Sequence, residues 1–202
     1  MIAIIDYGVG NLFSLSSSFS FIGTNVKITG DAEEIKRADK LVLPGVGAFE
    51  DAARKLRESG LDTLIRNEAK SGKSIMGICL GMQLLFEESH EYGIHKGLGL
   101  IPGSVEYMGD YISPTLKIPH IGWNALNKQR ETALLKYVKN GDFVYFVHSY
   151  FAKTQDEYIS SVSDYSYPIT ATVENGNVMG CQFHPEKSGE VGLNILRAFV
   201  EA

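Results

Sequence analysis

The chain has 202 residues, of which 44% are hydrophobic and 21% are charged, and its formal net charge is −5. This length allows one domain with a sizeable core, and the acidic balance argues against a nucleic-acid partner, which would require a basic surface. No apolar run approaches the length of a membrane-spanning helix, and the first residues resemble a strand rather than a signal peptide. The two cysteines lie far apart and form neither a disulfide framework nor a zinc motif. We therefore expect a single domain over residues 1–202, in the reducing cytoplasm and without a membrane anchor.

Strand-like and helix-like segments alternate through the first half of the chain. The predicted strands are Ile2–Ile5, Val26–Thr29, Leu41–Leu43 and Ser74–Ile78. The predicted helices are Leu12–Ile22, a short one capped by Asp31, Phe49–Glu58, and Leu61–Ser71, with Gly60 as the break between the last two. This alternation is typical of an α/β fold with a parallel sheet that helices cover on both faces.

Ligands of such sheets bind at the carboxyl ends of the strands. Three segments follow predicted strands directly and should open on that edge: the Asp6–Asn11 loop, the Pro44–Gly47 loop and Cys79. The first of these begins like a dinucleotide-binding fingerprint. Phe13 occupies its third glycine position, so we discount nucleotide binding.

Helical periodicity fades between Gly93 and Gly141. The predicted strands beyond this region are Asp142–Val147, Ile159–Val162, Ile169–Val173 and Val178–Phe183. An Asn-Gly pair joins the last two, which predicts a C-terminal antiparallel hairpin. An amphipathic helix over Glu190–Val200 closes the chain.

Cys79 lies between Gly77 and Gly81, where a predicted strand meets a helix-like segment, Met82–Glu88. This pattern is typical of a nucleophile elbow, a turn so sharp that only small neighbours fit. A helix N-terminus beside the sulfur would favour the thiolate. The alternative is that Cys79 is a small buried hydrophobic residue, which is also our interpretation of Cys181.

His184-Pro185-Glu186 follows about a hundred residues after the cysteine. Residues two apart in an extended segment share a face, so the carboxylate can orient the imidazole. Taken alone, the tripeptide also fits a surface turn with a salt bridge. Together with the elbow, it indicates a Cys-His-acid arrangement for nucleophilic acyl transfer.

Backbone amides near Cys79 are candidates for an oxyanion hole. The peptides of Gly45, Val46 and Gly47 end a strand parallel to that of Cys79, and the Leu80 amide follows the sulfur. The alternative for this loop is a tight turn. His90, His95 and His120 lack metal-ligand spacing, so we expect no metal site.

The elbow, read as Gly77-x-Cys79-x-Gly81-x-Gln83, and the His-Pro-Glu segment together resemble the class I (triad-type) glutamine amidotransferases. That resemblance implies a flavodoxin-like, three-layer fold with a mostly parallel central sheet, and no cofactor. Four further segments are similar to the glutaminase subunits of imidazole glycerol phosphate synthases: Asp6–Leu12, Pro44–Phe49, Pro119–Asn124 and Tyr145–Tyr150.

The resemblance implies that Cys79 attacks the side-chain amide of L-glutamine, His184 transfers the proton, and Glu186 orients His184. Water then hydrolyses the glutamyl thioester. The residues implied to hold the amino-acid end of the substrate are Gln83, Ser149 and Tyr150. The ammonia would pass to a (β/α)8-barrel cyclase subunit, the partner in a heterodimer. The residues implied to face that partner are Asn11, Trp123 and Lys187, although the residues alone favour a core position for Trp123.

Many class I domains carry a glycine where Val46 stands here. A β-branched side chain resists positive φ, so we hypothesise that the loop becomes productive only when partner and nucleotide bind. Three other functions stay open: a glutaminase for pyridoxal phosphate or anthranilate synthesis, a stand-alone cysteine hydrolase, and a binding module with a decayed site.

Overall fold

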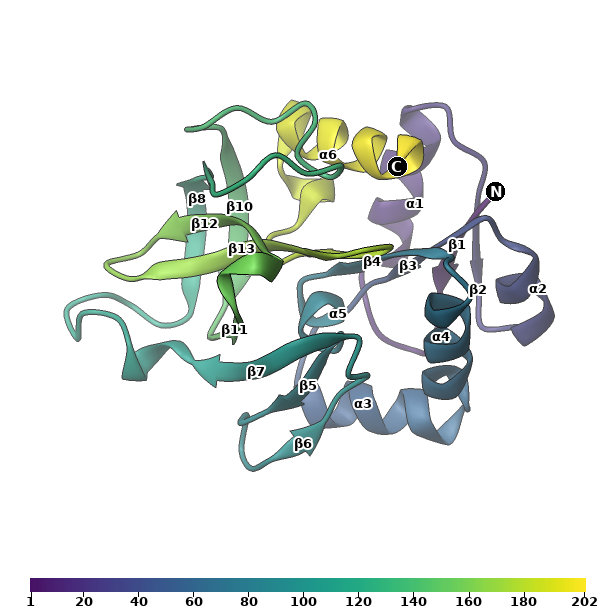
Figure 1. The fold of residues 1–202 in the computed structure, drawn as a ribbon, viewed down its shortest axis with the longest axis horizontal. Coiled ribbons are helices and arrows are strands. Elements are labelled where there is room, and N and C mark those ends of the chain that lie inside the picture. The colour runs from purple at the N-terminus through teal and green to yellow at the C-terminus, as the bar shows by residue number, and fades with distance from the viewer.

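An eight-stranded sheet forms the centre of the molecule in the computed structural model, which describes all 202 residues (Figure 1). In spatial order the strands are β2 (Val26–Thr29), β1 (Ile2–Ile5), β3 (Lys40–Leu43), β4 (Ser74–Ile78), β14 (Val178–Cys181), β13 (Pro168–Asn175), β12 (Ile159–Asp164) and β9 (Asn127–Lys128). The first five pair in parallel and the remaining pairs are antiparallel. The predicted mostly parallel sheet with a C-terminal hairpin is confirmed.

Helices cover both faces of this sheet (Figure 1). On one face lie α1 (Leu12–Phe21) and α6 (Gly189–Glu201), and on the other lie α2 (Ala32–Arg37), α3 (Phe49–Glu58) and α4 (Leu61–Lys70). Successive strand residues point to opposite faces of the sheet, so each strand contributes side chains to two hydrophobic cores. Ile4 is buried in the core with Phe19 and Phe199, whereas Ile5 is buried in the core with Phe49. Both predicted helical layers are therefore present.

The predicted helix Met82–Glu88 is wrong beyond Gln83. The helix α5 spans only Leu80–Gln83, and Phe86–Ser89 forms the strand β5. This strand belongs to a second sheet of order β11-β7-β5-β6, with β6 (His95–Lys96), β7 (Ile101–Tyr107) and β11 (Tyr150–Lys153). Pairing with β7 gives β5 a backbone ladder and outweighs its local helical pattern.

The region without helical periodicity contains strands that the sequence did not predict. They are β6, β7, β8 (His120–Ala125) and β9, and β8 pairs with β10 (Phe143–His148) in a two-stranded sheet. Three short 3₁₀ turns complete the chain: Met108–Asp110, Asp156–Tyr158 and Pro185–Lys187. None of the helices is long and apolar enough to cross a bilayer.

The local signals for turns and caps agree with the structure. Asp31 Oδ1 accepts a hydrogen bond from the Glu34 amide at 2.9 Å and caps α2. Gly60 has φ +72° between α3 and α4, and Gly176 has φ +58° in the hairpin between β13 and β14. A positive φ favours glycine because it has no Cβ.

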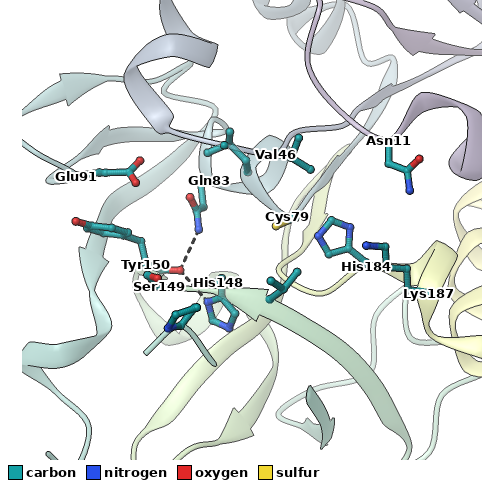
Figure 2. A pocket seen from close by; sticks show the side chains of 14 residues that line it. Asn11, Val46, Cys79, Gln83, Glu91, His148, Ser149, Tyr150, His184 and Lys187 are labelled. Atoms are coloured by element: carbon teal, nitrogen blue, oxygen red, sulfur yellow. Dashed lines mark hydrogen bonds between the residues drawn. The ribbon is translucent and has the colours of Figure 1, made fainter. Parts of the chain in front are cut away.

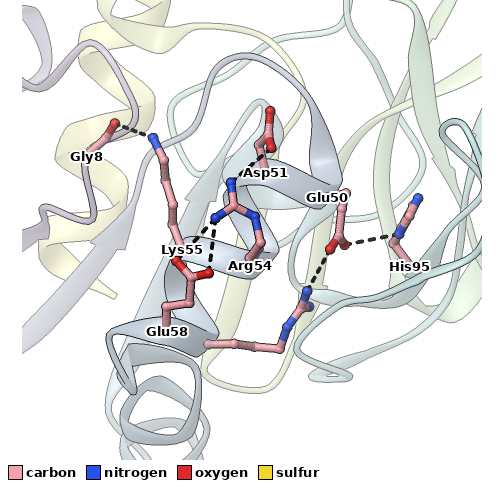
Figure 3. Close-up of polar contacts among 8 residues, drawn as sticks. Gly8, Glu50, Asp51, Arg54, Lys55, Glu58 and His95 are labelled. Atoms are coloured by element: carbon pink, nitrogen blue, oxygen red, sulfur yellow. Dashed lines mark hydrogen bonds and ion pairs between the residues drawn. The ribbon is translucent and has the colours of Figure 1, made fainter.

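Polar contacts of α3 hold neighbouring segments together (Figure 3). Lys55 Nζ donates to the Gly8 carbonyl at 3.2 Å, which ties the loop after β1 to α3. Glu50 pairs with Arg57 at 3.0 Å and with His95 of β6 at 3.1 Å. Exposed pairs of this kind contribute little to stability, and neither Glu50 nor His95 lines the cavity described below.

Candidate active site

Cys79 stands at the sharp turn between β4 and α5. Its φ of +55° and ψ of −113° are unusual for a residue with a Cβ, and such a conformation costs on the order of 1–3 kcal/mol. The turn is held by a hydrogen bond of 2.8 Å from the Cys79 amide to the Cys181 carbonyl. A Cβ on Gly77 would lie 2.6 Å from Met82 Cα, and one on Gly81 would lie 1.8 Å from the Leu43 carbonyl oxygen. The structure therefore has the predicted elbow, and both glycines are required by close approach.

His184 reaches the elbow from the segment that follows β14. Its Nδ1 lies 2.9 Å from Glu186 Oε1, and the two side chains are only 4% and 3% exposed. This burial rules out the alternative of a surface turn. Burial lowers the pKa of His184, but hydrogen bonds to Cys79 and Glu186 outweigh that effect and raise it to about 10. The imidazolium is thus the favoured form beside the sulfur.

Cys79 and His184 lie side by side at one end of a cavity of about 370 Å³ (Figure 2). The other predicted site residues that line this cavity are Asn11, Val46, Gly47, Leu80, Gln83, Ser149, Tyr150 and Lys187. The three loops expected at the carboxyl edge of the sheet therefore meet in one place. Of the remaining predicted residues, Glu186 lies behind His184, Gly45 packs against Leu80 and Gly81 of α5, and Trp123 lies outside the cavity lining.

The Pro44–Gly47 loop packs directly on the first turn of α5. A Cβ on Gly45 would lie 2.7 Å from the Gly81 amide nitrogen, and Gly47 adopts φ +94°. The buried Tyr7 hydroxyl donates to the Pro44 carbonyl at 2.7 Å and fixes the start of the loop. The first amides of a helix lack intrahelical partners, so the Leu80 N–H is suited to bind an oxyanion near the sulfur.

Gln83 forms the wall of the cavity opposite His184. Its Nε2 donates to the Tyr150 carbonyl and to Gln182 Oε1, both at 3.0 Å. Gln182 in turn donates from Nε2 to Cys79 Sγ at 3.8 Å. The sequence reasoning missed Gln182 as a site residue, although the period-two pattern of an extended segment places it on the same face as His184.

Glu91 is a second residue that the sequence reasoning missed. It lines the cavity near Gln83 and Tyr150 (Figure 2), and its Oε2 accepts from the Phe49 amide at 2.6 Å. A carboxylate at this position suits a cationic group such as an α-ammonium. No local motif marked Glu91, because the hairpin of β5 and β6 that carries it was not predicted.

Trp123 is 51% exposed, so the core position that the residues alone favoured is wrong. Its ring contacts Tyr145 edge to face at 6.0 Å, and Lys187 Nζ lies 5.9 Å from the centre of the Tyr145 ring. Ile121 of the same strand is 58% exposed. We refer to Ile121, Trp123, Tyr145 and Lys187 as the Trp123 surface; through Lys187 it continues into the cavity mouth.

Cys181 is fully buried, as predicted for a core residue, and burial raises the pKa of its thiol well above the ordinary value. No group of three or more His, Cys, Asp or Glu side chains is arranged to hold a metal ion. The reactive groups that the site brings together are one sulfur, one imidazole and the acid behind it.

Comparisons with known proteins show the family of proteins to which this site is similar. The family model described as "Glutamine amidotransferase class-I" matches residues 3–202. The chain is similar to the "Imidazole glycerol phosphate synthase subunit HisH" of Listeria monocytogenes serotype 4a, with 49% identity over 100% of the chain and 95% of the relative. The proteins of the same name from Bacillus cereus and Caldanaerobacter subterraneus are also 49% identical; the matches cover 98% and 100% of the chain, and 93% and 98% of those relatives.

Solved structures share the fold at much lower identity. One is described as a glutamine amidotransferase, with a TM-score of 0.77, 18% identity, and coverage of 100% of this chain and 98% of the other. Another is PurLQS from Thermotoga maritima, with a TM-score of 0.78, 20% identity, and coverage of 99% and 97%.

Proposed function

Because the chain belongs to the class-I glutamine amidotransferase family, we propose that it is the glutaminase subunit of an imidazole glycerol phosphate synthase, built as a single domain. The observation that carries the proposal is the convergence of Cys79 and His184 in one cavity, with Glu186 buried behind the imidazole. The full-length similarity to subunits of that synthase supports this assignment over the other amidotransferases that share the fold.

In the proposed reaction, Cys79 Sγ attacks the side-chain amide carbon of glutamine. His184 holds the thiol proton and delivers it to the departing ammonia, while Glu186 stabilises the imidazolium. The amide of Leu80 and the peptides of the Gly45–Gly47 loop would stabilise the oxyanion. Water, deprotonated by His184, then cleaves the glutamyl thioester and releases glutamate.

The opposite end of the cavity is suited to the amino-acid part of glutamine. Gln83, Ser149 and Tyr150 line it with polar groups, and Glu91 adds the negative charge that an α-ammonium requires. The cavity of about 370 Å³ is large enough for a free amino acid and lies at the site edge expected for this fold.

The proposed partner is a (β/α)8-barrel cyclase subunit. With the ammonia it would convert a phosphoribulosyl aminoimidazole carboxamide nucleotide to imidazole glycerol phosphate and an aminoimidazole carboxamide ribotide. Exposed aromatic residues are enriched at protein interfaces, and the Trp123 surface together with Asn11 borders the cavity mouth. An ammonia molecule leaving this mouth would enter the docked partner rather than solvent. Val46 is 44% exposed at the cavity, which supports the hypothesis that binding of partner and nucleotide would reorient the Gly45–Gly47 peptides.

The test uses the complex of this chain with the cyclase subunit from the same organism. It compares synthesis from two nitrogen sources, glutamine and an ammonium salt. Cys79→Ala should abolish synthesis from glutamine but retain synthesis from an ammonium salt. Cys181→Ala, which removes the other sulfur, serves as the matched control and should support both reactions. Equal loss of both reactions in Cys79→Ala would contradict the proposal, and glutamine hydrolysis that no barrel partner affects would favour a stand-alone hydrolase.

A further inference from the structure

Two buried histidines lie beside the cavity and have no part in the proposed reaction. His148 lines the cavity, and its Nδ1 lies 2.8 Å from the Tyr150 carbonyl oxygen (Figure 2). Its Nε2 lies 3.2 Å from Nδ1 of His120. The His120 ring is enclosed between Tyr165, at a centroid distance of 4.1 Å, and Phe146, at 5.0 Å. Both histidines are almost fully buried, at 6% and 1% exposed.

This geometry fixes the tautomers of both rings. A backbone carbonyl only accepts hydrogen bonds, so the proton of His148 must sit on Nδ1. In the neutral ring, Nε2 is then an acceptor, and His120 must donate to it from its own Nδ1. Burial, and the proximity of His120 and His184, lower the pKa of His148 to about 3, which agrees with a neutral ring.

The Tyr150 carbonyl accepts a second hydrogen bond, and that bond reaches the nucleophile. Gln83 Nε2 donates to the same oxygen at 3.0 Å, so the carbonyl dictates which end of the Gln83 carboxamide faces it. The second N–H of Gln83 goes to Gln182 Oε1, which leaves Gln182 Nε2 to face Cys79 Sγ. We refer to the Gln83 and Gln182 side chains as the carboxamide chain.

We infer that His120 and His148 are positioning residues that hold the Tyr150 carbonyl and thereby orient the carboxamide chain between substrate and nucleophile. Both N–H groups of Gln83 are engaged, so its Oε1 is the group presented to a donor on the substrate. Neither histidine touches the reacting atoms; they act through the carbonyl. The inference rests on the proposed function, because the substrate that Gln83 meets is taken to be glutamine.

The first test needs no variant and no substrate. Long-range 1H–15N correlation spectra of the histidine rings in the free wild-type chain report the tautomer of each ring at neutral pH. The expected result is a neutral Nδ1–H tautomer for both His120 and His148. A charged ring, or an Nε2–H tautomer at His148, would overturn the inference whatever reaction the protein performs.

The second test compares two substitutions at position 148 in the complex with the cyclase subunit. Asparagine places an N–H near the position of Nδ1 and can donate to the carbonyl, whereas leucine cannot. His148→Leu should raise the KM for glutamine by about tenfold or more, and His148→Asn should restore it to within about threefold of wild type. His95→Leu, outside the cavity, is the matched control and should leave KM unchanged.

Equal impairment by leucine and asparagine would indicate a merely structural role and overturn the inference, as would a normal KM in His148→Leu. If His148→Leu does not fold, the tautomer spectra and the KM of His148→Asn decide whether the inference holds. A wild-type complex that does not hydrolyse glutamine would refute the proposed function. The tautomer measurement does not depend on that result, because it uses the free chain without substrate.

Discussion

Nδ1 of His184 lies 2.9 Å from Oε1 of Glu186, and the two side chains are 4% and 3% exposed. Little water can screen this pair, so the carboxylate acts on the imidazole at close to full strength. Because Nδ1 is engaged, Nε2 is the nitrogen left to exchange a proton with Cys79. This hydrogen bond therefore sets the tautomer and the orientation of the proposed base, and together with Cys79 it favours the charged ring.

Glu186→Gln should lower kcat for glutamine hydrolysis by about 10²–10⁴-fold. Glutamine has nearly the same shape as glutamate but cannot neutralise an imidazolium, so KM should change little. Steady-state kinetics of the complex measure both values. Glu190→Gln, four residues further along the chain, is the matched control. A fall in kcat no larger than in this control would show that the acid is dispensable.

The pH dependence of stability should carry the signature of His184. Its pKa rises from 6.5 to about 10 in the folded protein, so the folded state keeps a proton that the unfolded chain loses between those values. The stabilisation is fully present below pH 6.5 and is lost as the pH rises toward 10, by at most about 1.4 kcal/mol per pH unit. Urea unfolding of wild type and His184→Gln between pH 6.5 and 9.5 measures the difference, which should shrink with rising pH. A difference that stays constant would contradict this account.

Glu91→Gln should raise the KM for glutamine by about tenfold and alter kcat less, because the ground-state contact with an ammonium is lost. The substituted amide can still accept from the Phe49 amide, so the local fold should persist. Glu88→Gln, on the same hairpin but outside the cavity lining, should have no effect. If both variants behave alike, Glu91 does not bind the substrate.

Trp123→Ala should weaken the complex with the cyclase subunit by about 2 kcal/mol, or roughly thirtyfold in Kd. Titration calorimetry measures this directly. Phe21→Ala is the matched control, because Phe21 is also a large exposed aromatic residue, 78% exposed, at the end of α1. Equal weakening by both variants, or by neither, would place the docking surface elsewhere.

Much of the fold and site follows from local patterns in the sequence. The alternation of strands and helices in the first half predicted the parallel sheet, and Cys79 between two glycines predicted the elbow. These signals are local: hydrophobic periodicity, caps, and a turn that only glycine permits. Each of these local patterns has the expected structure in the folded protein, because no contact with a distant segment of the chain favours a different one.

What the sequence did not predict depends on contacts between distant residues. Phe86–Ser89 becomes a strand because β7 pairs with it, and that pairing brings Glu91 to the cavity. The hydrogen bond between His120 and His148 joins strands that pair antiparallel across 28 positions of sequence. Trp123 is exposed although tryptophan is usually buried, and the pattern of residues around it in the sequence does not distinguish a core position from the proposed partner surface.

In the proposed reaction, the sulfur of Cys79 carries the glutamyl group. Mass spectrometry of the complex, quenched with acid during turnover of glutamine, tests it most directly. We expect a glutamyl adduct on the peptide that contains Cys79, both in the wild type and in Glu186→Gln. No adduct should form when asparagine replaces glutamine as the substrate. Hydrolysis without any adduct in either protein, or an adduct on Cys181, would contradict it.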